Sequence, residues 1–307
     1  MDFCQQVEHS LHKKFSKTIW SKFVAAIKQF EMIQPDDRIA VCISGGKDSM
    51  LLAKLMQQLH KVSDFPFEIK FLVMDPGYLP ENRALIEQNA ASMNIPITVV
   101  ENNIFNVVYN EPKNPCYLCS RMRRGTLYSA AKSIGCNKIA LGHHFDDMIE
   151  TVLMSIIYGS QVRTMMPKLH SDNFEGMELI RPLYLVRESE IIRWKEYNGL
   201  RFLQCACRFT EASEHHEDLS KRREIKGIIA RLEKANSQIP YNIYQSMLNV
   251  KLDNVIKYKH HGVEHSFLED YDAPLDENAR LEQIAQLIEE KALSPQDAAA
   301  IVRAAKK

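Results

Sequence analysis

Apolar residues in the first part of the chain recur at helical spacing. Between residues 3 and 34 they stand four positions apart in the series Phe15, Ile19, Phe23 and Ile27. Such spacing puts apolar side chains on one face of a helix. The pattern therefore predicts one or two helices over residues 1–35, ahead of the first strand.

From Asp37 onward, short apolar runs alternate with longer amphipathic ones. The short runs predict strands at 38–43, 68–74, 97–101 and 137–141, and the longer ones predict helices at 48–60, 80–93, 120–134 and 145–158. Strands separated by helices form a parallel sheet through right-handed crossovers. The sequence thus predicts an α/β fold, a parallel twisted sheet with helices on both faces, in which ligands bind at the carboxyl ends of the strands.

The second half of the chain is predicted to be mainly helical. Residues 181–186 are expected to form a further strand or an extended edge, and residues 188–197 a helix. The polar, irregular segment 258–278 is the best linker candidate. We expect four parts: an N-terminal helical segment (1–35), a main α/β domain (36–210), its helical C-terminal part (211–257), and a linker with a helical tail (258–307).

Composition narrows the class of protein. The chain has 307 residues and a hydrophobic content of 45%, which is ample for a core. Lys+Arg and Asp+Glu are equal at 39 each, so RNA contacts would have to come from local basic patches. No bilayer-length apolar run or signal-peptide pattern occurs, so we expect a cytoplasmic protein. Seven cysteines then favour metal ligands or reactive thiols over disulfides.

The loop Ser-Gly-Gly-Lys-Asp-Ser at 44–49 joins the first predicted strand to a helix. Gly45 and Gly46 lack a Cβ, so their N–H groups can approach an anion closely. The free N–H groups and the positive dipole end of the helix face the same place. This pattern predicts a phosphate site, although the loop is too short for the ordinary mononucleotide loop.

The remaining side chains of this loop suit the same ligand. Ser44 and Ser49 can donate hydroxyl groups, and Lys47 supplies a mobile positive charge. Asp48 would repel phosphates unless a cation or a backbone donor binds it, and magnesium is the natural candidate. The alternative is a turn that only ends the strand and caps the helix.

Cysteines form two close pairs, Cys116 with Cys119 and Cys205 with Cys207. Two pairs could hold zinc, but the Cys-x-Cys spacing and the long gap differ from common zinc ribbons. An iron-sulfur cluster is the competing interpretation, because its ligands can come from distant segments. A redox dithiol at the start of a helix is a third.

Polar residues also follow the second and fourth predicted strands. Asp75 could recognise the ribose or adenine of a nucleotide, or could only form the strand-terminal turn. In the segment that begins at Gly142, His143 or His144 could contact phosphate, and Asp147 could accept a proton, bind magnesium or orient a base. For Asp146 a helix N-cap is an equal alternative to chemistry.

Two basic clusters are candidates for RNA contact. The first consists of Arg121, Arg123 and Arg124, directly after Cys119, and helical spacing puts Arg121 and Arg124 on one face. For the second, at 221–223, a solvated helix face is favoured.

Three further segments, at 116–128, 138–147 and 166–183, together with the loop at 44–49, resemble the tRNA 2-thiocytidine synthetase family of the pyrophosphatase-type (PP-loop) ATPases. The resemblance runs from about residue 10 to about residue 250 and implies an adenine nucleotide alpha hydrolase-like fold. It also implies an enzyme that adenylates the C2 oxygen of an anticodon-loop cytidine in tRNA and replaces it with sulfur, using ATP, Mg²⁺ and a [4Fe-4S] cluster.

The resemblance assigns roles to residues of this chain. Lys47, Asp48 and Asp147 would be catalytic, and the cluster would be held by Cys116, Cys119 and Cys205. The family has a second Cys-x-x-Cys where this chain has Cys-Ala-Cys, so Cys207 is the alternative third ligand. ATP would be bound by Ser44, Gly45, Gly46, Lys47, Asp48, Ser49, Asp75, Gly142 and His143.

The resemblance further suggests a homodimer and a sulfur donor such as a cysteine desulfurase or free sulfide. Two other functions stay open on the sequence: a related sulfurtransferase acting on another nucleobase or a small molecule, and a non-catalytic zinc or sulfur-relay binding protein. The enzymatic hypothesis requires Lys47 and the paired cysteines to lie at the same end of the sheet.

Overall fold

A computed structural model describes residues 1–109, 115–203, 217–269 and 271. The chain divides into two compact units, Met1–Met247 and Leu248–Lys307. The first unit therefore takes in the predicted N-terminal segment, the α/β domain and most of the helical part that follows it. The predicted helical tail beyond residue 271 lies outside the described residues.

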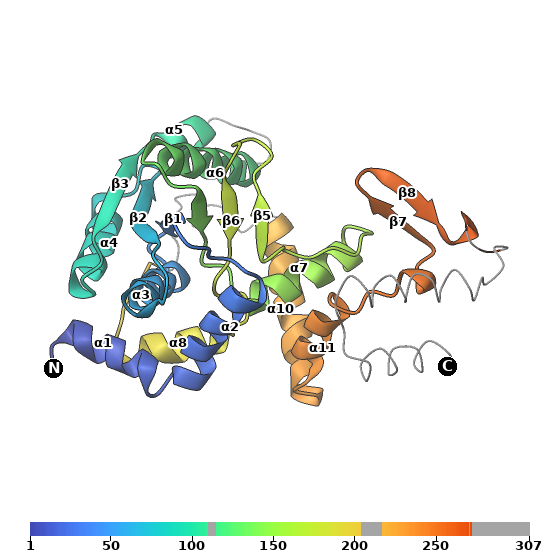
Figure 1. Ribbon diagram of the computed structural model, residues 1–307, viewed down its shortest axis with the longest axis horizontal. Helices are drawn as coiled ribbons and strands as arrows, with labels where there is room; N and C mark the ends of the chain where they lie inside the picture. The colour runs from blue at the N-terminus through green and yellow to red at the C-terminus, as the bar shows by residue number, and fades with distance from the viewer. Residues whose placement is uncertain (110–114, 204–216, 270, 272–307) are drawn as a thin grey trace. The chain divides into compact units, whose positions relative to one another are not determined.

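A six-stranded sheet forms the centre of the first unit, in the order β3-β2-β1-β4-β6-β5 (Figure 1). All neighbouring strands are parallel except β5, which pairs antiparallel with β6. The strands are β1 (Arg38–Ile43), β2 (Glu68–Asp75), β3 (Ile97–Glu101), β4 (Lys138–Ala140), β5 (Lys168–His170) and β6 (Glu178–Ile180). The order reverses between β1 and β4, and in open α/β sheets ligands bind at such a switch point.

Helices cover both faces of this sheet. The helix α6 packs on β2 and β4, and α3 packs on β1 and β2. Figure 1 shows α5 and α6 on one side of the strands, with α3, α8, α1 and α2 on the other. The helices are α1 (Phe3–His12), a π-helix (Ser16–Trp20), α2 (Ser21–Gln29), α3 (Lys47–Val62), α4 (Pro80–Ser92), α5 (Ile104–Tyr109), α6 (Pro115–Ser133), α7 (Phe145–Ile157), α8 (Glu188–Tyr197), α10 (Glu217–Ala235) and α11 (Ile239–Ser246).

The strand β1 shows why the sheet is buried on both faces. Ile39, Val41 and Ile43 belong to the larger hydrophobic cluster, whereas Ala40 and Cys42 belong to a second cluster. Alternate side chains of a strand point to opposite faces, so a strand covered on both sides is apolar throughout. The continuous apolar run read from the sequence has this cause, and the predicted α/β fold is confirmed.

Two local predictions differ from the structure, and one strand was not predicted. The strand expected at 181–186 ends before Arg181, because β6 occupies Glu178–Ile180 and a turn follows. The helix expected from residue 120 begins at Pro115, so Cys116 and Cys119 lie inside α6 rather than ahead of it. The short antiparallel strand β5 was not predicted, since its three residues carry no periodic signal.

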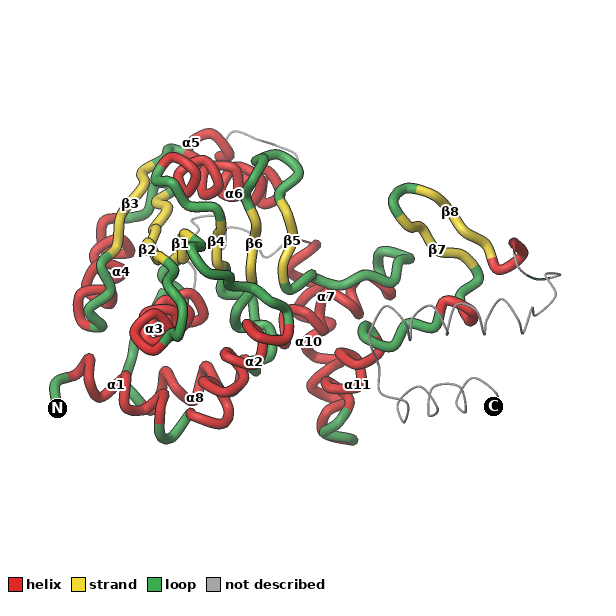
Figure 2. The backbone as a smooth tube through the Cα atoms, viewed as in Figure 1, coloured by secondary structure: helices red, strands yellow, loops and turns green. Residues whose placement is uncertain are grey.

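The second unit contains a small β-hairpin. Strands β7 (Lys257–His260) and β8 (Val263–Ser266) pair antiparallel across a turn at His261 and Gly262, both of which have positive φ. Figure 2 marks these strands. The hairpin lies in the segment predicted as an irregular linker. The polar sequence of this segment gave no strand signal, so the pairing of β7 with β8 was not predicted. In the described part of the chain, every helix is too short or too polar to cross a bilayer.

Candidate nucleotide and thiolation site

Gly45 gives the loop after β1 its shape. Its φ is +83°, and a Cβ at this position would lie 2.6 Å from Cγ1 of Ile86 in α4 and 2.8 Å from Cδ1 of Leu203. Both the left-handed backbone and the close packing require glycine. The N–H group of Leu203 also donates to the carbonyl of Gly45, at 3.1 Å.

The N-terminus of α3, which this loop opens, is not capped by a described side chain. Gly46 is the N-cap residue, in an extended conformation. The two serines brace the loop instead, because Ser49 Oγ accepts a hydrogen bond from Ser44 N at 3.1 Å and donates one to the Gly46 carbonyl at 3.0 Å. The first turn of α3 is thus left uncapped, which suits an anion, and the phosphate site stays a prediction.

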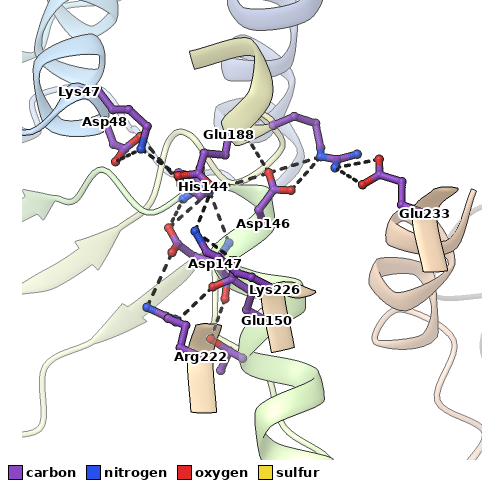
Figure 3. Close-up of polar contacts among 12 residues, drawn as sticks. Lys47, Asp48, His144, Asp146, Asp147, Glu150, Glu188, Arg222, Lys226 and Glu233 are labelled. Atoms are coloured by element: carbon purple, nitrogen blue, oxygen red, sulfur yellow. Dashed lines mark hydrogen bonds and ion pairs between the residues drawn. The ribbon is translucent and has the colours of Figure 1, made fainter. Parts of the chain in front are cut away.

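Lys47 lies between two carboxylates at the start of α3. Its ammonium group donates to Glu188 Oε1 at 2.9 Å and to Asp48 Oδ2 at 3.2 Å (Figure 3). Burial lowers the pKa of Lys47, but these two carboxylates outweigh burial and hold the pKa above its ordinary value. Lys47 is therefore charged at neutral pH and oriented by groups from α3 and α8.

The loop after β4 approaches the same turn of α3. A Cβ on Gly142 would lie 3.0 Å from the carbonyl carbon of Asp48 and 3.0 Å from Ser49 N. The position therefore requires glycine for close backbone contact, and it brings the start of α7 beside the phosphate loop.

A reciprocal capping box closes the N-terminus of α7. The N-cap residue is His144, whose Nδ1 accepts from Asp147 N at 3.4 Å, while Asp147 Oδ2 accepts from His144 N at 3.0 Å. Burial raises the pKa of Asp147, but its contacts with His144 outweigh burial and hold the pKa below its usual range. Asp147 is thus an ionised structural cap in this geometry, and its catalytic role stays a prediction.

Asp146 caps a different helix. Its Oδ2 accepts from the backbone N–H of Glu188 at 2.6 Å, at the first residue of α8, and its Oδ1 accepts from Arg187 Nε at 3.0 Å. Arg187 in turn donates from Nη2 to both carboxylate oxygens of Glu233 in α10, at 3.0 and 3.1 Å. These contacts fix the position from which Glu188 reaches Lys47.

A second group of charges surrounds Glu188 and the buried Glu150. Lys226 of α10 donates to Glu188 Oε2 at 3.0 Å and lies 3.6 Å from Glu150 Oε1. Arg222 Nε approaches Glu150 Oε2 to 3.1 Å without the alignment of a hydrogen bond. Burial raises the pKa of Glu150 to about 7 despite both cations. For Glu188 burial also raises the pKa, but Lys47 and Lys226 outweigh it and hold the pKa at about 2.

His143 and Arg181 lie at the carboxyl ends of the neighbouring strands β4 and β6. Among the described residues, His143 Nδ1 and Arg181 Nε are buried without a hydrogen-bond partner. Burial, helped by the nearby Arg181, lowers the pKa of His143 to about 4, so the ring is neutral at physiological pH. His143 Nδ1 and the Arg181 Nε–H group are therefore left to make hydrogen bonds that the described residues do not supply.

Asp75 has its carboxylate engaged at the end of β2. Its Oδ1 accepts from the N–H groups of Gly77 and Tyr78 at 2.8 and 2.7 Å, and its Oδ2 accepts from Arg83 Nη1 at 2.8 Å. These contacts form a strand-terminal turn, which is one of the two roles predicted for Asp75. Its predicted nucleotide contact stays a prediction.

The paired cysteines belong to the first turns of α6, which runs antiparallel to the strands. Thr126 near the middle of the helix is bonded to Asn102 just after β3, whereas Asn137 beyond its end is bonded to Arg38 at the start of β1. The first turns of α6 therefore lie at the carboxyl edge of the sheet, the edge that carries Lys47. The thiol of Cys119 is buried there. Cys205 and Cys207 lie outside the described residues.

The two basic clusters differ in exposure and contacts. Arg121 and Arg124 are exposed on α6, and Arg123 is partly exposed. In the second cluster, Arg223 is exposed, whereas the partly exposed Arg222 also pairs with the buried Glu150, a contact that was not predicted.

Sequence reasoning missed Glu188, Glu150, Arg187 and Lys226 as site residues. The spacing in α10 carried a usable signal, because Arg222 and Lys226 share a face with the buried Ile225 and Ile229. Charged residues among buried ones on a single helix face imply buried partners.

An open, mostly parallel sheet with an uncapped glycine loop and a lysine at its switch point defines a nucleotide-binding α/β protein. The PP-loop domain profile matches residues 16–208, and the chain belongs to the PP-loop family. Figure 3 shows the charged groups that surround the loop lysine of this member.

Similar proteins narrow the group within that family. A tRNA-cytidine(32) 2-sulfurtransferase from Neisseria meningitidis is 40% identical over 207 residues, which cover 66% of this chain and 63% of the relative. One from Legionella pneumophila (strain Paris) is 38% identical over 229 residues, covering 74% of this chain and 78% of the relative. The predicted resemblance to the 2-thiocytidine synthetases is confirmed, and the chain spans less than two thirds of the Neisseria relative.

A solved structure shares the fold. The U34-tRNA thiolase NcsA from Methanococcus maripaludis, with its [4Fe-4S] cluster, superposes with a TM-score of 0.58 at 22% identity, over 75% of this chain and 79% of that one. At this identity the likeness concerns the fold alone.

Proposed function

We propose that this chain is an ATP-dependent tRNA sulfurtransferase, which adenylates the C2 oxygen of an anticodon-loop cytidine and replaces that oxygen with sulfur. The names of the relatives support tRNA cytidine as the substrate. The observation that carries the proposal is the uncapped N-terminus of α3, with Lys47 beside it, at the switch point of the sheet.

ATP would bind with its phosphates on this loop. The left-handed Gly45 and the open first turn of α3 support a phosphate ligand. Asp48 Oδ1 is buried and has no hydrogen-bond partner among the described residues, which suits a carboxylate that receives Mg²⁺. His143 and Gly142, at the neighbouring strand end, complete the proposed nucleotide site.

The chemistry proceeds in two steps. In the first, the C2 oxygen of cytosine attacks the α-phosphorus of ATP, and pyrophosphate leaves. Lys47 and the N–H groups of α3 would stabilise the charge on pyrophosphate, a contribution typical of preorganised electrostatic catalysis. In the second, sulfide attacks C2 and AMP departs with the former cytosine oxygen. Asp147 would orient the base through its ionised carboxylate.

A [4Fe-4S] cluster would be held by Cys116, Cys119 and Cys205, with Cys207 as the alternative third ligand. The cluster would supply an iron that lacks a protein ligand and can bind sulfur. Positions 116 and 119 are neighbours on one helix face at the carboxyl edge, and Leu203, two residues before Cys205, is bonded to Gly45 of the phosphate loop. The helix that carries Cys116 and Cys119 thus begins at the sheet edge that carries the phosphate loop, and the last described residue before Cys205 is bonded to that loop. Both observations support a cluster near the nucleotide.

tRNA would contact Arg121, Arg123 and Arg124, which follow Cys119 on α6. Exposed arginines beside the proposed cluster suit phosphate groups of a splayed anticodon loop. We also propose a homodimer and an external sulfur donor, either a cysteine desulfurase or free sulfide.

Anaerobic reconstitution tests the proposed function. Purified protein with iron and sulfide is mixed with ATP, Mg²⁺, sulfide and tRNA lacking the modification, and the nucleosides are separated by mass. We expect 2-thiocytidine with wild type and none with Lys47→Met. A thiolated nucleoside other than cytidine would establish a different acceptor, and a colourless protein with stoichiometric zinc would refute the cluster.

A further inference from the structure

Glu188 contacts two cations from different elements of the first unit. Its Oε1 accepts from Lys47 on the phosphate loop at 2.9 Å, and its Oε2 accepts from Lys226 on α10 at 3.0 Å (Figure 3). The Glu188 carboxylate thus bonds both to the proposed nucleotide site and to a helix outside that site.

The backbone of Glu188 is held in place independently of both contacts. Its N–H group donates to Asp146 Oδ2 at 2.6 Å, and the preceding Arg187 is fixed by Asp146 and by Glu233. The backbone of Glu188 therefore stays in place if Lys47 moves toward a phosphate group, so their contact lasts only as far as the Glu188 side chain reaches.

Lys47 already has two carboxylates as partners, Glu188 and Asp48. Its side chain is 23% exposed and that of Glu188 is 25% exposed, so solvent screens their attraction only in part. A phosphate group that binds Lys47 must compete with Glu188 for the ammonium charge.

We propose that Glu188 is a positioning residue that competes with the nucleotide phosphates for Lys47, and that Lys226 weakens this competition by sharing the Glu188 carboxylate. The inference rests on the proposed binding of ATP at the loop. When the phosphates of ATP bind Lys47, the Glu188 carboxylate loses that partner and interacts more strongly with Lys226. By reciprocity, nucleotide binding then strengthens the attachment of α10, the helix that carries Arg222 and Lys226.

Removing the charge of Glu188 and removing its partner Lys226 have opposite expected effects on nucleotide affinity. Glu188→Gln keeps the shape but removes the competing charge, so nucleotide binding tightens roughly three- to tenfold. Lys226→Met leaves Glu188 wholly to Lys47, so binding weakens roughly two- to fivefold. In the double variant the effect of Lys226→Met disappears, because its route through Glu188 is gone.

Glu190→Gln is the matched control in the same helical turn. The Glu190 carboxylate pairs with Arg193 at 2.6 Å, and its side chain is 16% exposed. The same loss of one carboxylate charge there should leave nucleotide affinity within about twofold of wild type.

The experiment is calorimetric titration of the full chain and the four variants with α,β-methylene-ATP and Mg²⁺, an analogue that cannot release pyrophosphate. Thermal unfolding checks that each variant is folded, and Lys226→Met tests the inference even if Glu188→Gln does not fold. Tighter binding by Glu188→Gln and weaker binding by Lys226→Met support it.

Two negative results are distinguishable. If wild type binds the analogue and Glu188→Gln binds it equally or more weakly, the competition is refuted while the proposed function stands. If Lys226→Met weakens binding equally with and without Glu188, the sharing is refuted. A wild type that binds neither the analogue nor pyrophosphate would overturn the proposed function and this inference together.

Discussion

The helices α3 and α7 both begin at the carboxyl edge of the sheet, and their N-termini differ. At α3 the N-cap is Gly46, and no described side chain closes the first turn. At α7 the side chains of His144 and Asp147 satisfy each other's backbone N–H groups in a capping box. An open N-terminus can bind an anion, whereas a closed one serves as a support.

This difference indicates separate roles for two adjacent strand–helix turns. The turn after β1 keeps its donors for a ligand, and the turn after β4 packs against it through Gly142. Polar residues at the same sheet edge can therefore have unlike roles, and the hydrogen bonds they already make distinguish those roles.

The largest expected effect comes from distorting the glycine loop that precedes the open N-terminus of α3. In Gly45→Ala the added Cβ meets Ile86 and Leu203 at under 3 Å in a left-handed backbone. Backbone strain and overpacking together should lower the free energy of unfolding by about 2–5 kcal/mol. Nucleotide binding should fall at least about a hundredfold, because the loop must move away from its phosphate-binding geometry. Chemical denaturation and calorimetric titration measure the two effects.

Gly176→Ala separates strain from packing in that result. Gly176 has a φ of +75°, and nothing lies within 4 Å of the Cβ that would be added. This variant should lose only about 1–2 kcal/mol, with unchanged nucleotide affinity. Equal losses of stability in the two variants would show that packing against Ile86 and Leu203 contributes nothing.

The next effect concerns the buried Glu150 on the closed helix α7. Its pKa is raised from 4.5 to about 7, so the folded chain binds a proton more strongly than the unfolded chain. The stabilisation of the folded chain by this bound proton is fully present below pH 4.5 and is lost as the pH rises through about 7. Relative to Glu150→Gln, wild type should lose about 1–3 kcal/mol of stability between pH 5 and pH 8. Parallel pH profiles of the two proteins in urea titrations would contradict this assignment.

The smallest effect tests the cap of α7. His144→Ala removes the side chain that accepts from Asp147 N and should cost about 1 kcal/mol in thermal or urea unfolding. His144→Asn supplies another good N-cap residue and should recover most of that loss. If alanine and asparagine variants are equally stable, the capping box does not stabilise this helix.

The sheet and the phosphate loop could be predicted from sequence because their signals are local. The strand at 38–43 has the predicted bounds, and the loop follows it directly. Apolar runs report burial on both faces, and glycine reports a backbone that other residues rarely adopt.

The charged network could not be predicted in the same way. Glu188 lies 141 positions from Lys47 along the chain, and only folding brings the pair to 2.9 Å. Asp146 was recognised as a possible cap, but its contact with the start of α8 depends on how two helices pack. A single sequence records residue types and spacing, and it does not record which distant partners meet.

Adenylation of the C2 oxygen is the central claim, and an isotope measurement tests it most directly. tRNA carrying ¹⁸O at C2 of the target cytidine is thiolated in a single turnover with ATP, Mg²⁺ and sulfide, and the AMP released is analysed by mass. The account predicts that the AMP contains the ¹⁸O atom, in equal amount to the 2-thiocytidine formed. Unlabelled AMP, with its new oxygen taken from water, would contradict the account.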